Sequence, residues 1–188
     1  MKNFILGIVA ALVVLAVIGF IGVTQGILIP ANADAVPSKL ERWAAGKSLH
    51  ATIAREATLA PNPLAANDVN LEAGVKLYAA NCAACHGTAD GKPSTIAFGL
   101  YQKAPQFAND GVEDDPEGVT YWKVSHGIRL TGMPAFVRSL DRNDIWKIAL
   151  FLKHMDALPP AAKKLWEQQR NPVAMVPQDR LPRKEARP

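Results

Sequence analysis

Two cysteines and a histidine lie together in residues 82–86, which read Cys-Ala-Ala-Cys-His. Side chains three positions apart share one face of a helical turn, so Cys82 and Cys85 can both bond to the vinyl groups of one porphyrin. His86 follows directly and can ligate the iron of that porphyrin. This pattern is the signature of covalent haem attachment. The chain has only these two cysteines, which excludes a disulfide elsewhere and a four-cysteine zinc site.

Two other kinds of site also use a Cys-x-x-Cys pair. A thioredoxin-like redox pair follows a strand and begins a helix, whereas residues 71–81, which precede the pair here, have a helical pattern. A structural zinc site needs two further ligands at familiar spacings, and His50, His126 and His154 are scattered along the chain. The sequence therefore favours haem over a redox dithiol or a zinc site.

Met133 is the predicted sixth ligand of the iron. It lies between Gly132 and Pro134, in a stretch whose spacing does not match core packing. A thioether is a soft ligand that favours ferrous iron and raises the haem potential relative to ligation by two histidines. The flanking glycine and proline would restrict the loop that presents it. His126 is the alternative ligand. Three further candidates are expected in core or solvent-facing positions: Met155, His50 and His154.

The N-terminal segment is predicted to span a membrane. No charged side chain occurs between Lys2 and Asp34, and about twenty helical residues cross the ~30 Å hydrocarbon core of a bilayer. The positive-inside tendency keeps the Lys2 end cytoplasmic. A cleaved signal peptide is the alternative, because residues 31–33 and 33–35 fit the small-residue cleavage pattern. The length of the apolar run favours a retained anchor over residues 1–30, and both interpretations export the rest of the chain.

Two segments flank the predicted compact module. Residues 36–68 are expected to be a helical spacer and linker, whose helix starts with a capping box at Ser38 and Glu41. This helix could lie on the membrane, dock on the module or act as a spacer. Residues 159–188 form a basic, proline-rich tail that is predicted to be disordered. The part after Ala162 accounts for the formal net charge of +4, and export makes nucleic acid an unsuitable partner.

The compact module is predicted to cover residues 70–158 and to be all-α. A module of this size cannot bury a large core alone, and a haem at its centre would supply the missing apolar surface. The first helix, with Asn70 as its N-cap, is expected to pack across the last, which begins at Asp141, with Gly74 allowing close approach. Helices are expected at three places: 71–81, 119–126 and 141–155.

Glycines and prolines mark residues 87–118 as mostly loop. Within this loop, residues 110–117 are rich in aspartate and glutamate but lack the spacing of a calcium-binding loop. The expected role is a solvated loop, and docking to a basic partner is the alternative.

Together these motifs resemble class I cytochromes c, and most closely the single-haem, membrane-anchored bacterial type. The resemblance covers residues 70–158. It implies an all-α cytochrome c fold wrapped around one covalently attached haem c, with one haem edge exposed and the N-terminal transmembrane helix ahead of it. It also implies a proline carbonyl that accepts the second ring proton of the axial histidine, for which Pro93 is the candidate. The motifs are these: Gly74-x-x-x-Tyr78, Cys82–His86, His126-Gly-Ile128, Thr131–Pro134 and a closing aromatic helix.

The function expected from these motifs and this resemblance is one-electron transfer rather than enzymatic catalysis. Cys82 and Cys85 would hold the haem, and His86 and Met133 would ligate its iron. The domain would face the periplasm from a bacterial inner membrane, or be soluble there after signal cleavage, and would meet a redox-protein donor and acceptor. The alternatives are a haem subunit of a larger dehydrogenase or oxidase, and a haem enzyme or gas sensor with a displaceable sixth ligand.

Overall fold

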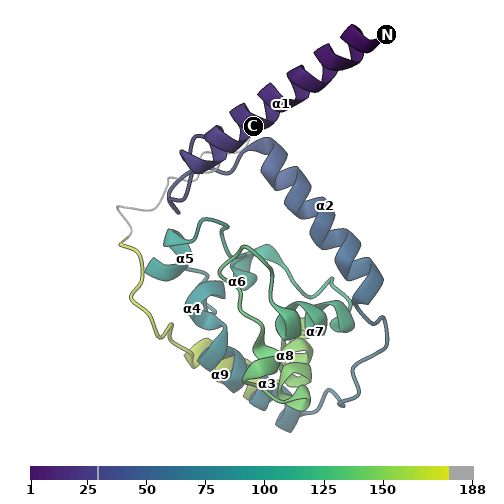
Figure 1. Ribbon diagram of the computed structural model, residues 1–188. Helices are drawn as coiled ribbons and strands as arrows, with labels where there is room; N and C mark the ends of the chain where they lie inside the picture. Colours follow the sequence, from purple (N-terminus) through teal and green to yellow (C-terminus); the bar gives the residue numbers. More distant parts are fainter. Residues whose placement is uncertain (29, 178–188) are drawn as a thin grey trace, which may run out of the picture. The chain divides into compact units, whose positions relative to one another are not determined.

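The computed structural model describes residues 1–28 and 30–177, and the chain forms two units, Met1–Ala35 and the part from Val36 onward (Figure 1). Both units are built from helices. Within the described ranges, the β pairing consists of one isolated bridge between Ser94 and Met175. The predicted all-α fold class is therefore confirmed.

The first unit is built around α1 (Lys2–Thr24). Its most apolar 18-residue window has a mean hydropathy of 3.1, and none of that window is buried against protein. A helix of this length and composition suits the hydrocarbon core of a membrane. The prediction of an N-terminal helix long enough to span a membrane is confirmed.

The second unit holds the remaining helices, and short 3₁₀ turns η1 (Phe136–Arg138) and η2 (Met155–Ala157) flank α8. In chain order its α-helices are α2 (Lys39–Glu56), α3 (Asp68–Asn81), α4 (Ala83–His86), α5 (Thr95–Gly99), α6 (Phe107–Asp110), α7 (Glu117–His126), α8 (Arg142–Lys153) and α9 (Pro160–Gln168).

The core of this unit lies where α3 crosses α8, with α7 and α9 packed beside them. The rings of Tyr78, Phe151 and Trp166 meet edge to face, with centroids 5.3–5.4 Å apart, a geometry that adds to the gain from burial. The Tyr78 hydroxyl donates a hydrogen bond to the Gly87 carbonyl at 2.9 Å. Burial raises the pKa of Tyr78 far above its ordinary value, so this hydroxyl stays a donor at any physiological pH.

Side-chain caps fix where the main helices begin. Ser38 accepts from the Glu41 amide and Asp141 from the Asp144 amide, as the sequence predicts. The prediction that Asn70 caps α3 is wrong. Asn67 is the cap and accepts from the Asn70 amide at 2.9 Å, so the helix starts earlier and includes Asn70.

The predicted close approach at Gly74 is confirmed. A Cβ atom at this position would lie 2.8 Å from the Phe151 Cβ and closer still to the Lys147 carbonyl oxygen. Both partners belong to α8, and one of them is backbone. A side chain at position 74 would therefore push the two central helices apart.

Gly74→Ala is accordingly expected to lower the free energy of unfolding by about 1–3 kcal/mol, the usual cost of overpacking a core. Gly46→Ala is the matched control, because Gly46 lies inside α2 and a Cβ there meets nothing within 4 Å. It should leave stability unchanged or raise it by about 0.5–1 kcal/mol, since alanine favours helix over glycine. Denaturant unfolding measures both, and equal effects would contradict the close-approach argument.

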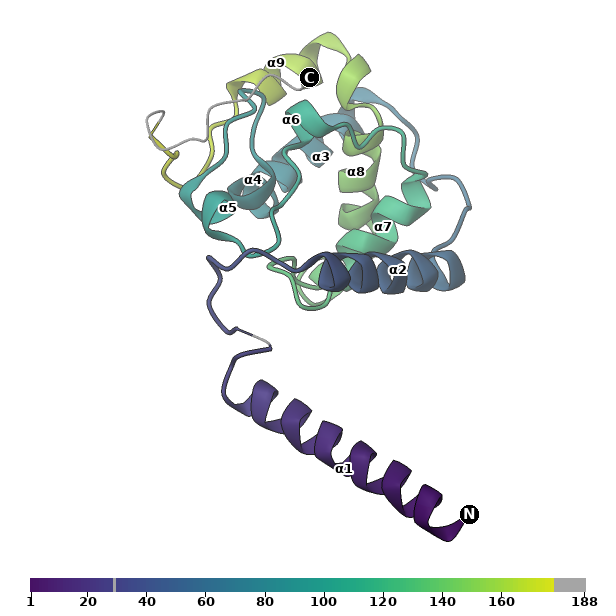
Figure 2. The ribbon, with the colours of Figure 1, turned by 90° about the horizontal axis from the view of Figure 1, so that it is seen from above.

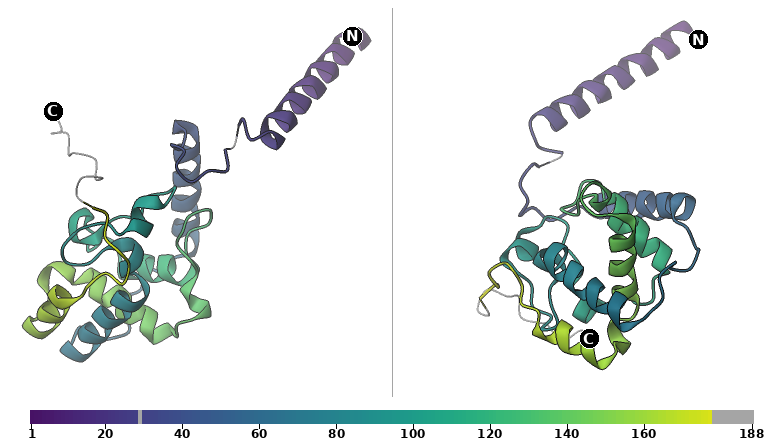
Figure 3. Two further views of the ribbon diagram at one scale, coloured as in Figure 1. Left: turned by 90° about the vertical axis from the view of Figure 1, so that its left-hand side faces the viewer. Right: turned by 90° about the horizontal axis from the view of Figure 1, so that it is seen from below.

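The C-terminal segment departs from its predicted disorder. Residues 160–168 form α9, and Trp166 and Val176 are buried. Beyond α9 the chain returns over α4 (Figure 3), where Asn171 Nδ2 donates to the Ala83 carbonyl at 2.7 Å. The Thr95 amide donates to the Ala174 carbonyl at 2.8 Å. The disorder prediction is wrong for residues 160–177, and residues 178–188 lie outside the described part.

Candidate functional site

A cavity of about 330 Å³ lies in the second unit, and the four side chains predicted to bind haem or its iron all line it. They are Cys82, Cys85, His86 and Met133. Most of the remaining wall is apolar, and it includes Leu100, Phe107, Val124, Ile128, Phe136 and Leu152. The structure thus brings together residues that are far apart in the sequence.

The two cysteines lie on a single helical turn. The amides of Cys85 and His86 both donate to the Cys82 carbonyl, at 3.0 and 2.9 Å. Cys82 is 8 % exposed and Cys85 is half-buried, and both are free thiols. Burial, and secondarily the neighbouring Cys85, raises the pKa of Cys82 to about 12. Burial also raises the pKa of Cys85.

These raised pKa values oppose the redox-dithiol interpretation, because reactive redox cysteines have lowered values. The zinc interpretation is opposed by a different observation, the lack of further ligands. Across residues 1–28 and 30–177 there is no group of three or more His, Cys, Asp or Glu side chains that could hold a metal ion. Two neutral thiols on one turn suit the formation of two thioether bonds.

Hydrogen bonding and stacking orient the imidazole of His86. Its Nδ1 lies 3.0 Å from the Pro105 carbonyl oxygen. A carbonyl can only accept, so Nδ1 carries the proton and Nε2 keeps the lone pair that a metal ion needs. The ring also stacks on Phe107, with centroids 4.4 Å apart and planes at 5°. Burial lowers the pKa of His86 and so favours the neutral ring, whereas the hydrogen bond to Pro105 acts in the opposite direction.

The assignment of Pro93 as the proline that orients His86 is wrong. The Pro93 carbonyl accepts instead from the Val176 amide at 3.3 Å, because the C-terminal segment lies along that part of the chain. A proline carbonyl does meet the histidine, but it belongs to Pro105. The resemblance therefore predicts the correct kind of hydrogen bond, from the histidine ring to a proline carbonyl, but the wrong proline.

Gln106 is a further residue that the sequence did not reveal. Its Nε2 donates to the carbonyls of Cys85 and Ala104, at 2.9 and 3.0 Å. These bonds tie the loop that carries Pro105 to the turn that carries the cysteines, and so fix the carbonyl that faces His86. Gln106 Oε1 is buried without a hydrogen-bond partner among the described residues. A lone glutamine in a loop gives no sequence signal for this role.

Met133 lies in a loop that closes on itself. The Ile128 amide donates to the Met133 carbonyl at 3.2 Å, and the Met133 amide donates to the Thr131 hydroxyl at 3.1 Å. Gly127 has a φ of +65°, and a Cβ there would come within 2.6 Å of the Met133 carbonyl oxygen. The loop therefore needs glycine at this position. The Met133 side chain packs against the core cluster and lines the cavity.

His126, the alternative sixth ligand, lies outside the cavity that the other candidate residues line. It is exposed at the end of α7 and does not line the cavity. Its ring packs against Trp122, with centroids 5.1 Å apart.

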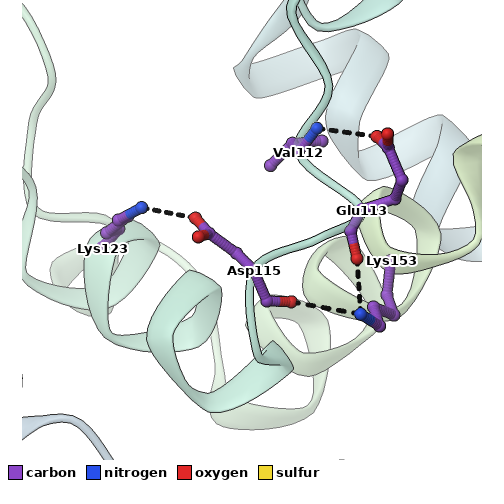
Figure 4. Close-up of polar contacts among 5 residues, drawn as sticks. All are labelled: Val112, Glu113, Asp115, Lys123 and Lys153. Carbon is purple, nitrogen blue, oxygen red and sulfur yellow. Dashed lines mark hydrogen bonds and ion pairs between the residues drawn. The ribbon is translucent and has the colours of Figure 1, made fainter.

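Two lysines hold the acidic loop (Figure 4). Lys153 on α8 donates to the carbonyls of Glu113 and Asp115, and Lys123 on α7 forms an ion pair with the Asp115 carboxylate. Asp115 and Lys123 also line the cavity. Part of this loop is therefore fixed to two helices through its backbone and the Asp115 carboxylate, while Asp110 and Asp114 stay exposed, and its solvated role stays a prediction.

These residues fit a covalently bound haem. The cavity combines two thiols on one turn, a neutral imidazole with a free lone pair, a thioether and mainly apolar walls. Apolar walls suit the macrocycle, and the imidazole and thioether are common axial ligands of haem iron.

Comparison with known protein families gives a match to part of the chain. Residues 69–152 match the family model described as "Cytochrome C oxidase, cbb3-type, subunit III". The matched segment runs from the first turn of α3 into the last turn of α8 and contains the cysteine pair, His86 and Met133. α2 and α9 lie outside it. No curated protein and no solved structure matches the chain.

Proposed function

Because residues 69–152 form a cytochrome c domain that carries covalently attached haem c, we propose that the chain is a membrane-tethered one-electron carrier. The observation that carries this proposal is that the Cys82–His86 turn and Met133 line the same apolar cavity. Cys82 and Cys85 would hold the haem through thioether bonds, and His86 and Met133 would ligate its iron. When bound, the haem supplies an iron that alternates between the ferrous and ferric states.

The chain's own residues set the conditions for this exchange. Pro105 and Phe107 hold His86 in one orientation, and Gly127 and Thr131 hold the loop of Met133. Ligands held in this way need not move when the charge on the iron changes. The Met133 thioether favours the ferrous state and so raises the reduction potential. Apolar walls that limit water near the metal act in the same direction.

The length and composition of α1 support membrane attachment. We propose that residues 1–30 remain as an anchor and that the haem domain lies on the periplasmic side of a bacterial inner membrane. The length of the apolar helix and the positive Lys2 flank support this orientation. An anchor raises the effective concentration of the domain near membrane-bound redox partners. A first residue at Asp34 or Val36 in the purified protein would instead identify α1 as a cleaved signal.

A second candidate role is a haem subunit of a larger oxidase. The description of the matched family, which names an oxidase subunit, favours this candidate. Extraction from membranes in mild detergent followed by native mass measurement distinguishes the two roles. A lone monomer would support an independent carrier, and a stable assembly would support a subunit.

The absorption spectrum of the full chain, matured with export and haem-attachment machinery, tests the proposed function. Two strong-field axial ligands predict a six-coordinate, low-spin spectrum in both oxidation states. Carbon monoxide should not bind the reduced protein at neutral pH, because Met133 occupies the sixth position. Rapid binding of carbon monoxide would contradict the carrier proposal and favour a haem enzyme or gas sensor.

A further inference from the structure

α2 contributes to the haem cavity although it lies outside the matched segment. Leu49, near the middle of this helix, lines the cavity together with the residues of the candidate site. The helix lies alongside α7 at one edge of the second unit (Figure 2). Its inward residues are half-buried, whereas Leu40 and Trp43 are 71 % and 62 % exposed. One face of α2 therefore packs on the domain and the other faces away.

Contacts at both ends hold this segment in place. Near the start of α2, the Tyr101 hydroxyl donates to the Glu41 carboxylate, at 2.7 and 2.8 Å from its two oxygens. Beyond the end of the helix, the Thr58 carbonyl packs so closely against Gly118 that a Cβ atom there would clash with it.

A third contact lies further along the chain. Asn62 Nδ2 donates to the Glu117 carboxylate and to the Trp146 carbonyl, both at 3.0 Å. The partners in these contacts belong to the loop after α5, to α7 and to α8. A segment tied to three separate parts of the domain is held across it rather than hinged at one end.

We propose that residues 39–62, here called the N-terminal strap, form a fixed wall of the haem site, and that Leu49 contacts the bound haem and keeps water out of its cavity. This inference rests on the proposed function. It adds a haem-contacting residue that lies outside the segment with the cytochrome c signature.

The physical consequence is a higher reduction potential. Ferric haem carries one more positive charge than ferrous haem, and surroundings of low polarity disfavour the more highly charged state. A leucine on the wall excludes water, and an amide at the same place would attract it. The strap also restricts how a small external ligand from solution can enter the cavity.

Leu49→Gln in the full-length, haem-loaded protein tests the proposal, and Leu40→Gln is the matched control because both leucines lie on the same helix and only Leu49 faces the cavity. Leu49→Gln should lower the reduction potential in an optical redox titration. It should also speed imidazole binding to the ferric protein roughly tenfold, which corresponds to an activation free energy lower by about 1.4 kcal/mol. Leu40→Gln should leave both quantities at their unaltered values.

Leu49→Met separates exclusion of water from simple packing. It keeps an apolar side chain of similar volume and should restore the potential and the imidazole-binding rate. Equal values for the Leu49→Gln and Leu40→Gln proteins would overturn the strap proposal alone. An unaltered chain that never holds haem would overturn both this proposal and the proposed function, so the two failures are distinguishable.

Discussion

The chain is expected to lose all covalently held haem when Cys82 and Cys85 are both replaced by alanine. The proposed thioether bonds are the only covalent links to the cofactor, since the bonds from His86 and Met133 to iron are coordinate bonds that denaturation breaks. Haem staining of a denaturing gel measures the result. The unaltered chain should stain at its own mass, and the double variant should not stain at all.

Met133→Ala is the control for this experiment, because it alters the same cavity and leaves both thiols in place. It should stain like the unaltered chain. Persistent staining of the double cysteine variant would contradict covalent attachment through the Cys82–His86 turn.

The Met133→Ala protein is expected to differ in its spectrum and in its potential. The weak absorption band that arises from thioether sulfur bound to ferric iron should disappear. The choice of axial ligands changes haem reduction potentials over a range of ~0.8 V. The potential of this variant should fall by a substantial part of that range. Carbon monoxide should then bind the reduced protein, because the sixth position is open. Absorption spectroscopy and redox titration check these three outcomes.

His126→Gln is the matched variant, since His126 was the alternative sixth ligand and the structure leaves it exposed beside Trp122. The band and the potential should be unchanged in this protein. The reverse pattern, with the band lost only on replacing His126, would transfer the assignment from Met133 to His126.

Local chemistry made much of the site predictable. The turn formed by Cys82, Cys85 and His86 depends on residues next to each other in the chain, and the cap at Asp141 acts over three residues. The close approach at Gly74 could be predicted because a glycine within a helix, which lacks a side chain, indicates close packing of another helix. Each of these features follows from short-range geometry that a sequence displays directly.

The orienting proline could not be identified in this way. Pro93 and Pro105 both lie in the glycine- and proline-rich stretch of residues 87–118, and the sequence does not distinguish their carbonyls as partners of His86. The choice depends on how the loop folds, which the hydrogen bond from Gln106 to the Cys85 carbonyl helps to fix. That contact joins residues 21 positions apart and has no local signature.

The positions of α2 and α9 were hidden for a different reason. In α2 the apolar residues are divided between two faces, with Leu49 inward and Leu40 and Trp43 outward, so the sequence left three placements open. Prolines begin α9 and follow it, and its few apolar residues make too short a pattern to show that the helix is buried. The largest apolar side chain of this helix, Trp166, gains its burial from Tyr78 and Phe151, which are distant in the sequence.

The return of residues 171–177 over α4 means that the folding unit is wider than its recognisable signature. A fragment limited to residues 69–152 would lack Trp166, which packs against Tyr78 in the core. It would also lack Asn171, whose side-chain amide donates to the Ala83 carbonyl beside the attachment turn. It would also discard the helix that carries Leu49. An excised, water-soluble version of this electron carrier should therefore run from residue 37 to residue 177 if its redox behaviour is to match that of the intact protein.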